Sequence, residues 1–168
     1  MTAPSTTLEL AVHAAVAEVD DPEYPGISIV DLGLLESIHL SDVATDTDQT
    51  GVTATLGLVP TFSGCPALGA IADDVRAAVE NVPGIGEVRV EWLITPVWTI
   101  DRVSADARRR MAEEFTVAVE IRGRSGAPSS RCPRCGAETI EQSPFGPSRC
   151  RSVHRCPQCS ETVEVMRT

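Results

Sequence analysis

The sequence contains no lysine and few aromatic residues. All 14 basic residues are arginine, a bias that we attribute to genome composition before function. Aromatic residues make up 4% of the chain, so aliphatic side chains must fill the core, and few rings remain on which nucleic-acid bases could stack. Because apolar residues still reach 42%, the chain is predicted to fold rather than to stay disordered.

No secretory signal and no apolar run of transmembrane length is visible. The first 21 residues lack a basic segment and carry Glu9 and Glu18 within their apolar pattern. We therefore expect a cytoplasmic protein with no membrane partner, in a compartment where thiols stay reduced. Six cysteines in that setting indicate metal binding or a reactive thiol rather than disulfides.

Negative charge is concentrated in the first three quarters of the chain. Residues 1–125 hold 8 arginines and 20 acidic residues, whereas residues 126–168 hold 6 arginines and 4 glutamates. The acidic part should repel nucleic-acid phosphates, so no nucleic-acid partner is expected. The change of sign also suggests two units.

Hydrophobic periodicity predicts the order α-β-β-α-β for the first unit. The spacing from Thr6 to Glu9 is typical of a capping box, and Pro66 stands where the first turn of a second helix would favour it. Strands are predicted at residues 35–40, 52–59, 88–94 and 117–121. Helices are predicted after residue 6, after residue 66 and at residues 105–114. An acidic loop is predicted at 42–50 and a linker at 122–130.

Four of the last five cysteines form two Cys-Pro-x-Cys turns with twenty residues between them. The pairs are Cys132 with Cys135 and Cys156 with Cys159. Each turn directs two sulfurs at one centre, and four thiolates make a closed tetrahedral Zn²⁺ site. A 38-residue tail with little core needs such a staple to fold. The spacing predicts a structural zinc ribbon, although four thiolates can also hold iron.

Two further candidate metal ligands lie between the cysteine pairs. Cys150 and His154 are candidate extra ligands, and the alternative is an idle thiol and imidazole beside a filled site. The predicted fold class is therefore α+β: a small α-β-β-α-β two-layer domain followed by a C-terminal zinc ribbon. The predicted boundaries are a domain at 1–121, a linker at 122–130 and the ribbon at 131–168.

The sixth cysteine, Cys65, stands alone between a predicted strand and a predicted helix. A thiol at the N-terminal end of a helix is close to unpaired N–H groups and to the positive end of the helix dipole, which favour the thiolate. Such a thiolate can attack an electrophile or bind a metal. The alternative is a small buried residue that fills the start of the helix.

An acidic loop precedes the first strand. Asp21, Glu23 and Asp31 could bind a cation there, but such residues more often cap turns. No phosphate-binding glycine loop, nucleotide fingerprint, nucleophile elbow or pair of di-iron Glu-x-x-His motifs is present.

Three motifs of the first unit resemble the SufT-type iron–sulfur assembly factors. They are Asp21-Pro22-Glu23, Asp31-Leu32-Gly33 and the Thr61-to-Pro66 motif T-x-x-x-C-P. The resemblance implies that Cys65 is a reactive thiolate or transient cluster ligand. It also implies a supporting pocket formed by Asp21, Glu23, Asp31, Thr61, Ser63 and Gly64.

The remaining motifs resemble the PaaD family of the phenylacetate pathway. Thr95 to Asp101, a short helix and a Cys-Pro-x-Cys ribbon with Phe145-Gly146 and the extra Cys150 carry this likeness. It implies an accessory component of the phenylacetyl-CoA ring 1,2-epoxidase that assembles or maintains the iron–sulfur cluster of the oxygenase reductase. The expected partners are the oxygenase and reductase subunits, and the expected cofactors are Zn²⁺ in the ribbon and a transient iron ion or Fe–S cluster.

One thiol cannot hold a cluster, so a homodimer, a second protein or Cys150 must supply further ligands. The resemblance favours a maturation factor over a catalyst. Two alternatives remain open: a non-catalytic interaction subunit of the oxygenase complex, and a nucleic-acid-binding ribbon that uses Arg149, Arg151 and Arg155.

Overall fold

The computed structural model describes residues 4–42, 51–119, 121–122 and 128–166 and divides the chain into two compact units. The first comprises Met1–Pro60 and Pro66–Val97, and the second comprises Thr61–Cys65 and Trp98–Thr168. Residues 43–50 of the acidic loop predicted at 42–50, and residues 123–127 of the predicted linker, lie outside the described residues, whereas Asp42 is the last residue of the strand Leu35–Asp42. No helix within the described ranges is long and apolar enough to cross a membrane.

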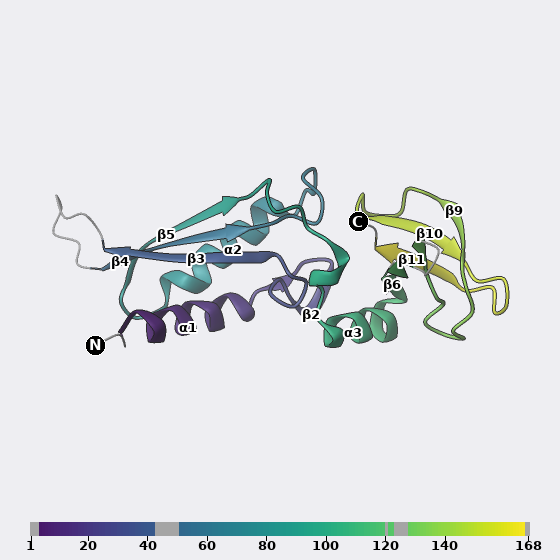
Figure 1. Ribbon diagram of the computed structural model, residues 1–168, viewed down its shortest axis with the longest axis horizontal. Helices are drawn as coiled ribbons and strands as arrows, with labels where there is room; N and C mark the ends of the chain where they lie inside the picture. Colours follow the sequence, from purple (N-terminus) through teal and green to yellow (C-terminus); the bar gives the residue numbers. More distant parts are fainter. Residues whose placement is uncertain (1–3, 43–50, 120, 123–127, 167–168) are drawn as a thin grey trace. The chain divides into compact units, whose positions relative to one another are not determined.

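A three-stranded sheet forms the centre of the first unit (Figure 1). Its order is β3 (Leu35–Asp42), β4 (Val52–Leu58) and β5 (Ile85–Trp92), with β3 antiparallel and β5 parallel to β4. The parallel pair needs a crossover, which α2 (Leu68–Glu80) provides. On one face of β4, Ala54, Leu56 and Leu58 are fully buried; on the other, Thr55 is half-buried and Thr53 is buried, so this central strand alternates only in part.

Two helices supply the rest of this core. Helix α1 (Pro4–Ala17) buries Val12 and Val16, and α2 buries Ile71, Val75 and Val79, at the helical spacing that the sequence predicts. Both helix starts differ from the prediction. Helix α1 already begins at Pro4, so Thr6 and Glu9 lie inside it and form no capping box. Helix α2 begins at Leu68, two residues after Pro66, and Ala67 at its N-cap makes no side-chain capping bond.

A short hairpin connects α1 to the sheet. Strand β1 (Asp20–Asp21) pairs with β2 (Tyr24–Ser28), where the sequence predicts only a proline-containing loop. Tyr24 and Ile27 are each 1% exposed, so the hairpin contributes to the core. It also fixes the turn that carries Asp21 and Glu23.

The second unit begins with a 3-10 turn and a charged helix. Turn η1 (Ile100–Arg102) leads to α3 (Ala105–Phe115). Ser104 caps this helix: its Oγ accepts a hydrogen bond of 3.1 Å from the backbone N–H of Ala107. Helix α3 buries Ala107 and Met111, whereas its exposed face carries arginine–glutamate pairs.

A four-stranded sheet completes this unit (Figure 1). Its order is β6 (Val117–Val119), β11 (Thr162–Met166), β10 (Arg151–Arg155) and β9 (Ile140–Ser143). Strands β9, β10 and β11 pair antiparallel, and β6 pairs parallel to β11, with Ala118 opposite Val165. Beyond β6, β7 (Ile121–Arg122) pairs with β8 (Pro128–Ser129).

The predicted α+β class is confirmed as a mixed α/β N-terminal part followed by a C-terminal sheet that carries the cysteines. The strand expected near 117–121 forms in part, as β6, and it pairs within the C-terminal sheet. The boundaries 1–121, 122–130 and 131–168 remain predictions of domain organisation.

Candidate metal centre and the Cys65 loop

Two tight turns of the same design hold the four C-terminal cysteines. In the first, the backbone N–H of Gly136 donates to the Cys132 carbonyl over 2.8 Å, and Cys132 N–H donates to the Ala137 carbonyl over 2.8 Å. In the second, Ser160 N–H donates to the Cys156 carbonyl over 3.0 Å. The residue after each second cysteine is left-handed, with φ of 75° at Gly136 and 62° at Ser160. Each turn therefore points its two sulfurs in one direction.

The left-handed position of the first turn yields a stability prediction. A Cβ added at Gly136 meets no atom within 4 Å, so Gly136→Ala should destabilise the ribbon through φ alone, by about 1 kcal/mol. Gly69 in α2 is the matched control, because a Cβ there also meets no atom within 4 Å and its φ is ordinary. Gly69→Ala should stabilise α2 by about 0.5 kcal/mol. Denaturant titrations followed at amides of β10 and α2 would measure both; equal effects of the same sign would contradict the prediction.

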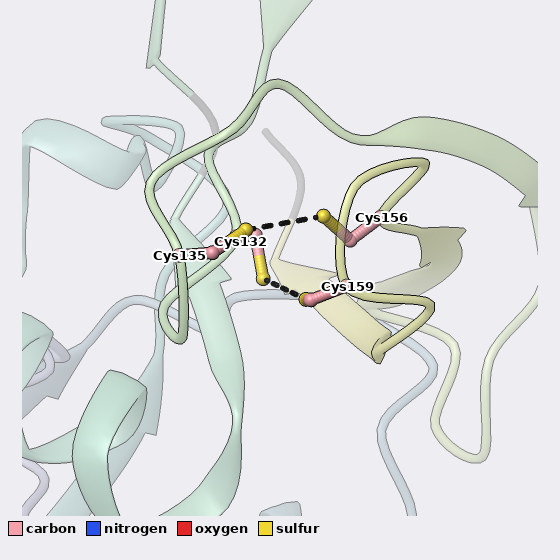
Figure 2. Close-up of side chains that lie close together, drawn as sticks. All are labelled: Cys132, Cys135, Cys156 and Cys159. Carbon is pink, nitrogen blue, oxygen red and sulfur yellow. Dashed lines mark hydrogen bonds between the residues drawn. The ribbon is translucent and has the colours of Figure 1, made fainter.

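The four sulfurs form one cluster (Figure 2). They lie within 4.8 Å of one another, with 3.6 Å between the Sγ atoms of Cys132 and Cys159 and 3.3 Å between those of Cys135 and Cys156. A disulfide needs about 2.05 Å between sulfurs, and no disulfide forms among the described residues, which include all six cysteines. Sulfurs bound tetrahedrally to Zn²⁺ at about 2.3 Å are about 3.8 Å apart. The donor set and its spacing therefore fit a metal ion held by four thiolates.

The surroundings of the cluster favour bound thiolates over free thiols. Cys132 and Cys156 are buried in a small core with Val163 and Val165. Backbone N–H groups, that of Cys159 first, donate to the Cys156 sulfur and lower its pKa to about 6. The Ala137 N–H lowers the pKa of Cys135, but hydrogen bonding with Cys156 and desolvation outweigh it and raise that pKa to about 12. Such close thiols cannot all ionise without a cation, so binding a metal must release protons.

The two candidate extra ligands lie outside this cluster. Among the described residues, the group that could hold a metal comprises the four cysteines alone. His154 is turned to hydroxyl groups: its Nδ1 lies 3.0 Å from Thr139 Oγ1 and its Nε2 lies 3.0 Å from Ser152 Oγ. Desolvation lowers the pKa of His154, although Glu141 opposes the shift. The Cys150 sulfur lies 3.4 Å from Ser148 Oγ.

The hydroxyl network around His154 was not foreseen from the sequence. Ser130, Thr139 and Ser152 are all buried, and each has an oxygen within 3.2 Å of a ring nitrogen. They come from widely separated positions, and single serines and threonines carry no spacing signal. The network accounts for a polar imidazole inside a small ribbon without assigning it to a metal.

The Cys65 loop is a tight turn ahead of α2. Cys65 is half-buried, and its backbone N–H donates to the Phe62 carbonyl over 3.1 Å. A Cβ at Gly64 would lie 2.7 Å from the Phe62 ring, so any larger residue there would require the ring to shift. Thr61 is half-buried and Ser63 is exposed. Since the helix starts at Leu68, Cys65 precedes its first turn by more than the sequence predicts.

The acidic residues serve local turns. The Asp21 Oδ1 accepts a hydrogen bond of 2.8 Å from the backbone N–H of Glu23. The Ser28 hydroxyl donates to Asp31 Oδ2 over 3.1 Å, and its oxygen accepts from Asp31 N–H over 3.0 Å. The contacts of Asp21 and Asp31 match the turn-capping alternative. The acidic turns belong to the first unit, whereas the Cys65 loop belongs to the second.

Two protein families match separate parts of the chain, as the two compact units also suggest. Residues 9–92 match the iron-sulfur cluster assembly protein family, and residues 117–167 match the PaaD zinc beta ribbon domain. The chain is 31% identical over 160 residues to a putative 1,2-phenylacetyl-CoA epoxidase subunit of Escherichia coli, and the match covers 93% of this chain and 90% of that protein.

Two shorter relatives match the N-terminal part. The Fe-S protein maturation auxiliary factor YitW of Bacillus subtilis is 32% identical over 97 residues, which are 58% of this chain and 86% of that protein. The second is known from the crystal structure of DUF59, a domain of unknown function from Bacillus anthracis, which superposes with a TM-score of 0.52. Its sequence is 30% identical, and the match covers 64% of this chain and 93% of the Bacillus anthracis chain. With an iron–sulfur assembly domain followed by a four-cysteine PaaD ribbon, the chain belongs to the PaaD-like family, whose members include the putative epoxidase subunit of Escherichia coli.

Proposed function

We propose that this protein is an accessory factor of a phenylacetyl-CoA ring 1,2-epoxidase and that it assembles or maintains the iron–sulfur cluster of the oxygenase reductase. The observation that carries the proposal is the combination of the two domains in one chain. The similarity to the putative epoxidase subunit of Escherichia coli extends across both domains and covers 90% of that protein. A shorter relative, which matches 58% of this chain, is an Fe-S protein maturation auxiliary factor.

Cys65 is the residue that we assign to the transient cluster. Its sulfur is soft, as iron in a cluster prefers, and a half-buried position leaves it within reach of a partner. A loop with one thiol holds a cluster weakly, which suits delivery rather than storage. A second copy of the chain, the client protein or Cys150 would complete the ligand set. Thr61, Ser63 and Gly64 of the same loop would shape its surroundings, and Asp21, Glu23 and Asp31 of the first unit would support the same function.

The ribbon is assigned a structural Zn²⁺. Cys132, Cys135, Cys156 and Cys159 would fill all four positions of a tetrahedral ion and leave none open for a substrate. Bound there, the ion would cross-link the two cysteine turns and would take part in no reaction step. The two tight turns and the buried Cys132 and Cys156 then orient the ribbon surface for a partner.

Co-expression tests this function. The oxygenase and its reductase would be produced with and without this chain, and iron and acid-labile sulfide would be measured per reductase. We expect less of both without the chain. Equal cluster content would refute the assembly role. An assembly factor should also be absent from the mature complex or present below one copy per reductase, whereas the alternative, a non-catalytic interaction subunit, would co-purify at a fixed ratio.

A further inference from the structure

A small cavity lies beside the first cysteine turn, entirely within the second unit. It has a volume of about 240 Å³. Helix α3 contributes Arg108 and Ala112 to its wall, β6 contributes Val117, and the turn contributes Arg131 and Pro133. Two arginines thus line one concave surface whose other lining residues are mostly apolar.

The backbone fixes one of these arginines in place. The half-buried Arg108 donates from Nε to the Val103 carbonyl over 3.0 Å and from Nη2 to the Ile100 carbonyl over 2.8 Å. Both acceptors are neutral, so they orient the guanidinium without neutralising its charge. Arg131 likewise donates from Nη1 to a carbonyl, that of Gly136, over 3.2 Å.

Neither arginine forms an ion pair with a carboxylate among the described residues. They share this with Arg155, in a chain with a net charge of −10. Six other arginines do form such pairs: Arg76, Arg89, Arg109, Arg110, Arg134 and Arg151. Like charges that line one cavity repel each other, and an anion bound there would relieve that repulsion.

The shape and lining of the cavity indicate what kind of anion fits. Pockets for whole small molecules usually measure about 300–1,000 Å³, so this one suits a group at the end of a short chain. Ala112, Val117 and Pro133 favour an aliphatic stem, and a guanidinium favours a planar carboxylate. We propose that the cavity receives a glutamate or aspartate side chain of a partner protein. The proposal uses no residue of the Cys65 loop and is independent of the assembly role.

The two arginines have an alternative role, which is to balance the negative charge of the metal centre. Cys132 also lines the cavity, and four thiolates around a divalent ion carry a net charge of −2. Arg108 and Arg131 would then balance the charge of the filled centre. In that case their replacement would weaken metal binding and leave the binding of acidic peptides unchanged.

NMR titration of the metal-loaded full chain with the blocked peptide acetyl-Gly-Glu-Gly-amide tests the proposal. We expect saturable shifts at the amides of Val117, Ala118 and Cys132 and at the Nε–H of Arg108, and binding weaker by about tenfold for the Gly-Gln-Gly peptide. Arg131→Gln should weaken binding of the glutamate peptide to a similar degree. Arg155→Gln is the matched control, since Arg155 also forms no ion pair with a described carboxylate and does not line the cavity.

A second variant tests the cavity and leaves Arg108 unchanged, because the Arg108 side chain also bonds the Val103 and Ile100 carbonyls before α3. Ala112→Glu retains a good helix former and places a carboxylate at the cavity, so it should block the peptide without loss of folding. Peptide shifts elsewhere, or shifts unchanged by Arg131→Gln and Ala112→Glu, would overturn the proposal. Free glutarate or inorganic phosphate binding as tightly as the peptide would also overturn it, in favour of a small-anion site. Loss of metal from Arg131→Gln with intact peptide binding would establish the alternative role.

Discussion

Replacing Cys156 with serine is expected to remove the metal from the ribbon and to unfold strands β9–β11. The Cys156 side chain is fully buried, and Val163 and Val165 pack in the same core. Structural Zn²⁺ contributes about 10–16 kcal/mol to folding in small zinc domains, and so small a core cannot replace it. Metal content should fall from one ion per chain to less than about a tenth of an ion. Elemental analysis and the amide spectrum of residues 140–166 would measure both effects.

Cys150→Ser is the matched control for this substitution. It makes the same chemical change in the same ribbon, but the Cys150 sulfur lies beside Ser148 and outside the four-cysteine cluster. Metal content and the β10–β11 pairing should stay intact. Equal metal loss from both variants would show that Cys150 is a ligand. The first unit should remain folded in each case, because its core of Leu56, Val75 and their neighbours contains no cysteine.

Cys65→Ser is expected to lower the cluster content of the co-expressed reductase to the level found without the chain. A serine hydroxyl matches the thiol in size but is a hard and mostly protonated ligand that binds iron–sulfur clusters poorly. The loop should keep its shape, since the bond from Cys65 N–H to the Phe62 carbonyl is made by backbone atoms. Iron and acid-labile sulfide per reductase are the measured quantities.

Ala70→Ser controls for the presence of a serine near the start of α2. Ala70 is an exposed position in the first turn of that helix, and its replacement should leave the cluster content at the wild-type value. Wild-type cluster content in the Cys65→Ser strain would remove Cys65 from the proposed mechanism. The epoxidase assignment would then rest on the ribbon and on the family relationship alone.

The four-cysteine cluster was predictable because its signal is local. Each Cys-Pro-x-Cys turn brings its own two sulfurs together, and the structure brings the two turns to one centre. The pairing of β6 was not predictable in the same way. Apolar residues at 117–121 predict a strand, but its partner β11 begins more than 40 residues later. Alternation along one strand carries no information about which strand lies beside it.

The starts of the helices were predicted less well than their buried faces. Val12, Val16, Ile71, Val75 and Val79 are buried as the helical spacing requires. Proline is accepted both at the first turn of a helix and in the turn before it. At Pro66 the second arrangement occurs, because the tight turn from Phe62 to Cys65 precedes the helix. At Pro4 the first arrangement occurs, and it places Thr6 inside α1.

The acidic residues show why residue type alone does not determine whether a loop binds a cation. Asp21 and Asp31 satisfy turn donors in the structure, as aspartates in loops commonly do. A cation site and a turn cap require the same side chain at the same kind of position. The sequence therefore could not decide between the two alternatives, and the pocket around Cys65 remains part of the proposed function.

Metal and sulfide analysis of the anaerobically purified chain tests the account most directly. We predict one zinc per chain that depends on Cys156, together with smaller amounts of iron and acid-labile sulfide that disappear in Cys65→Ser. The division between the two sites is the central claim: the ribbon holds a structural ion, and Cys65 carries a transient cluster. Iron and sulfide in place of zinc, lost with Cys156→Ser and unchanged by Cys65→Ser, would contradict it.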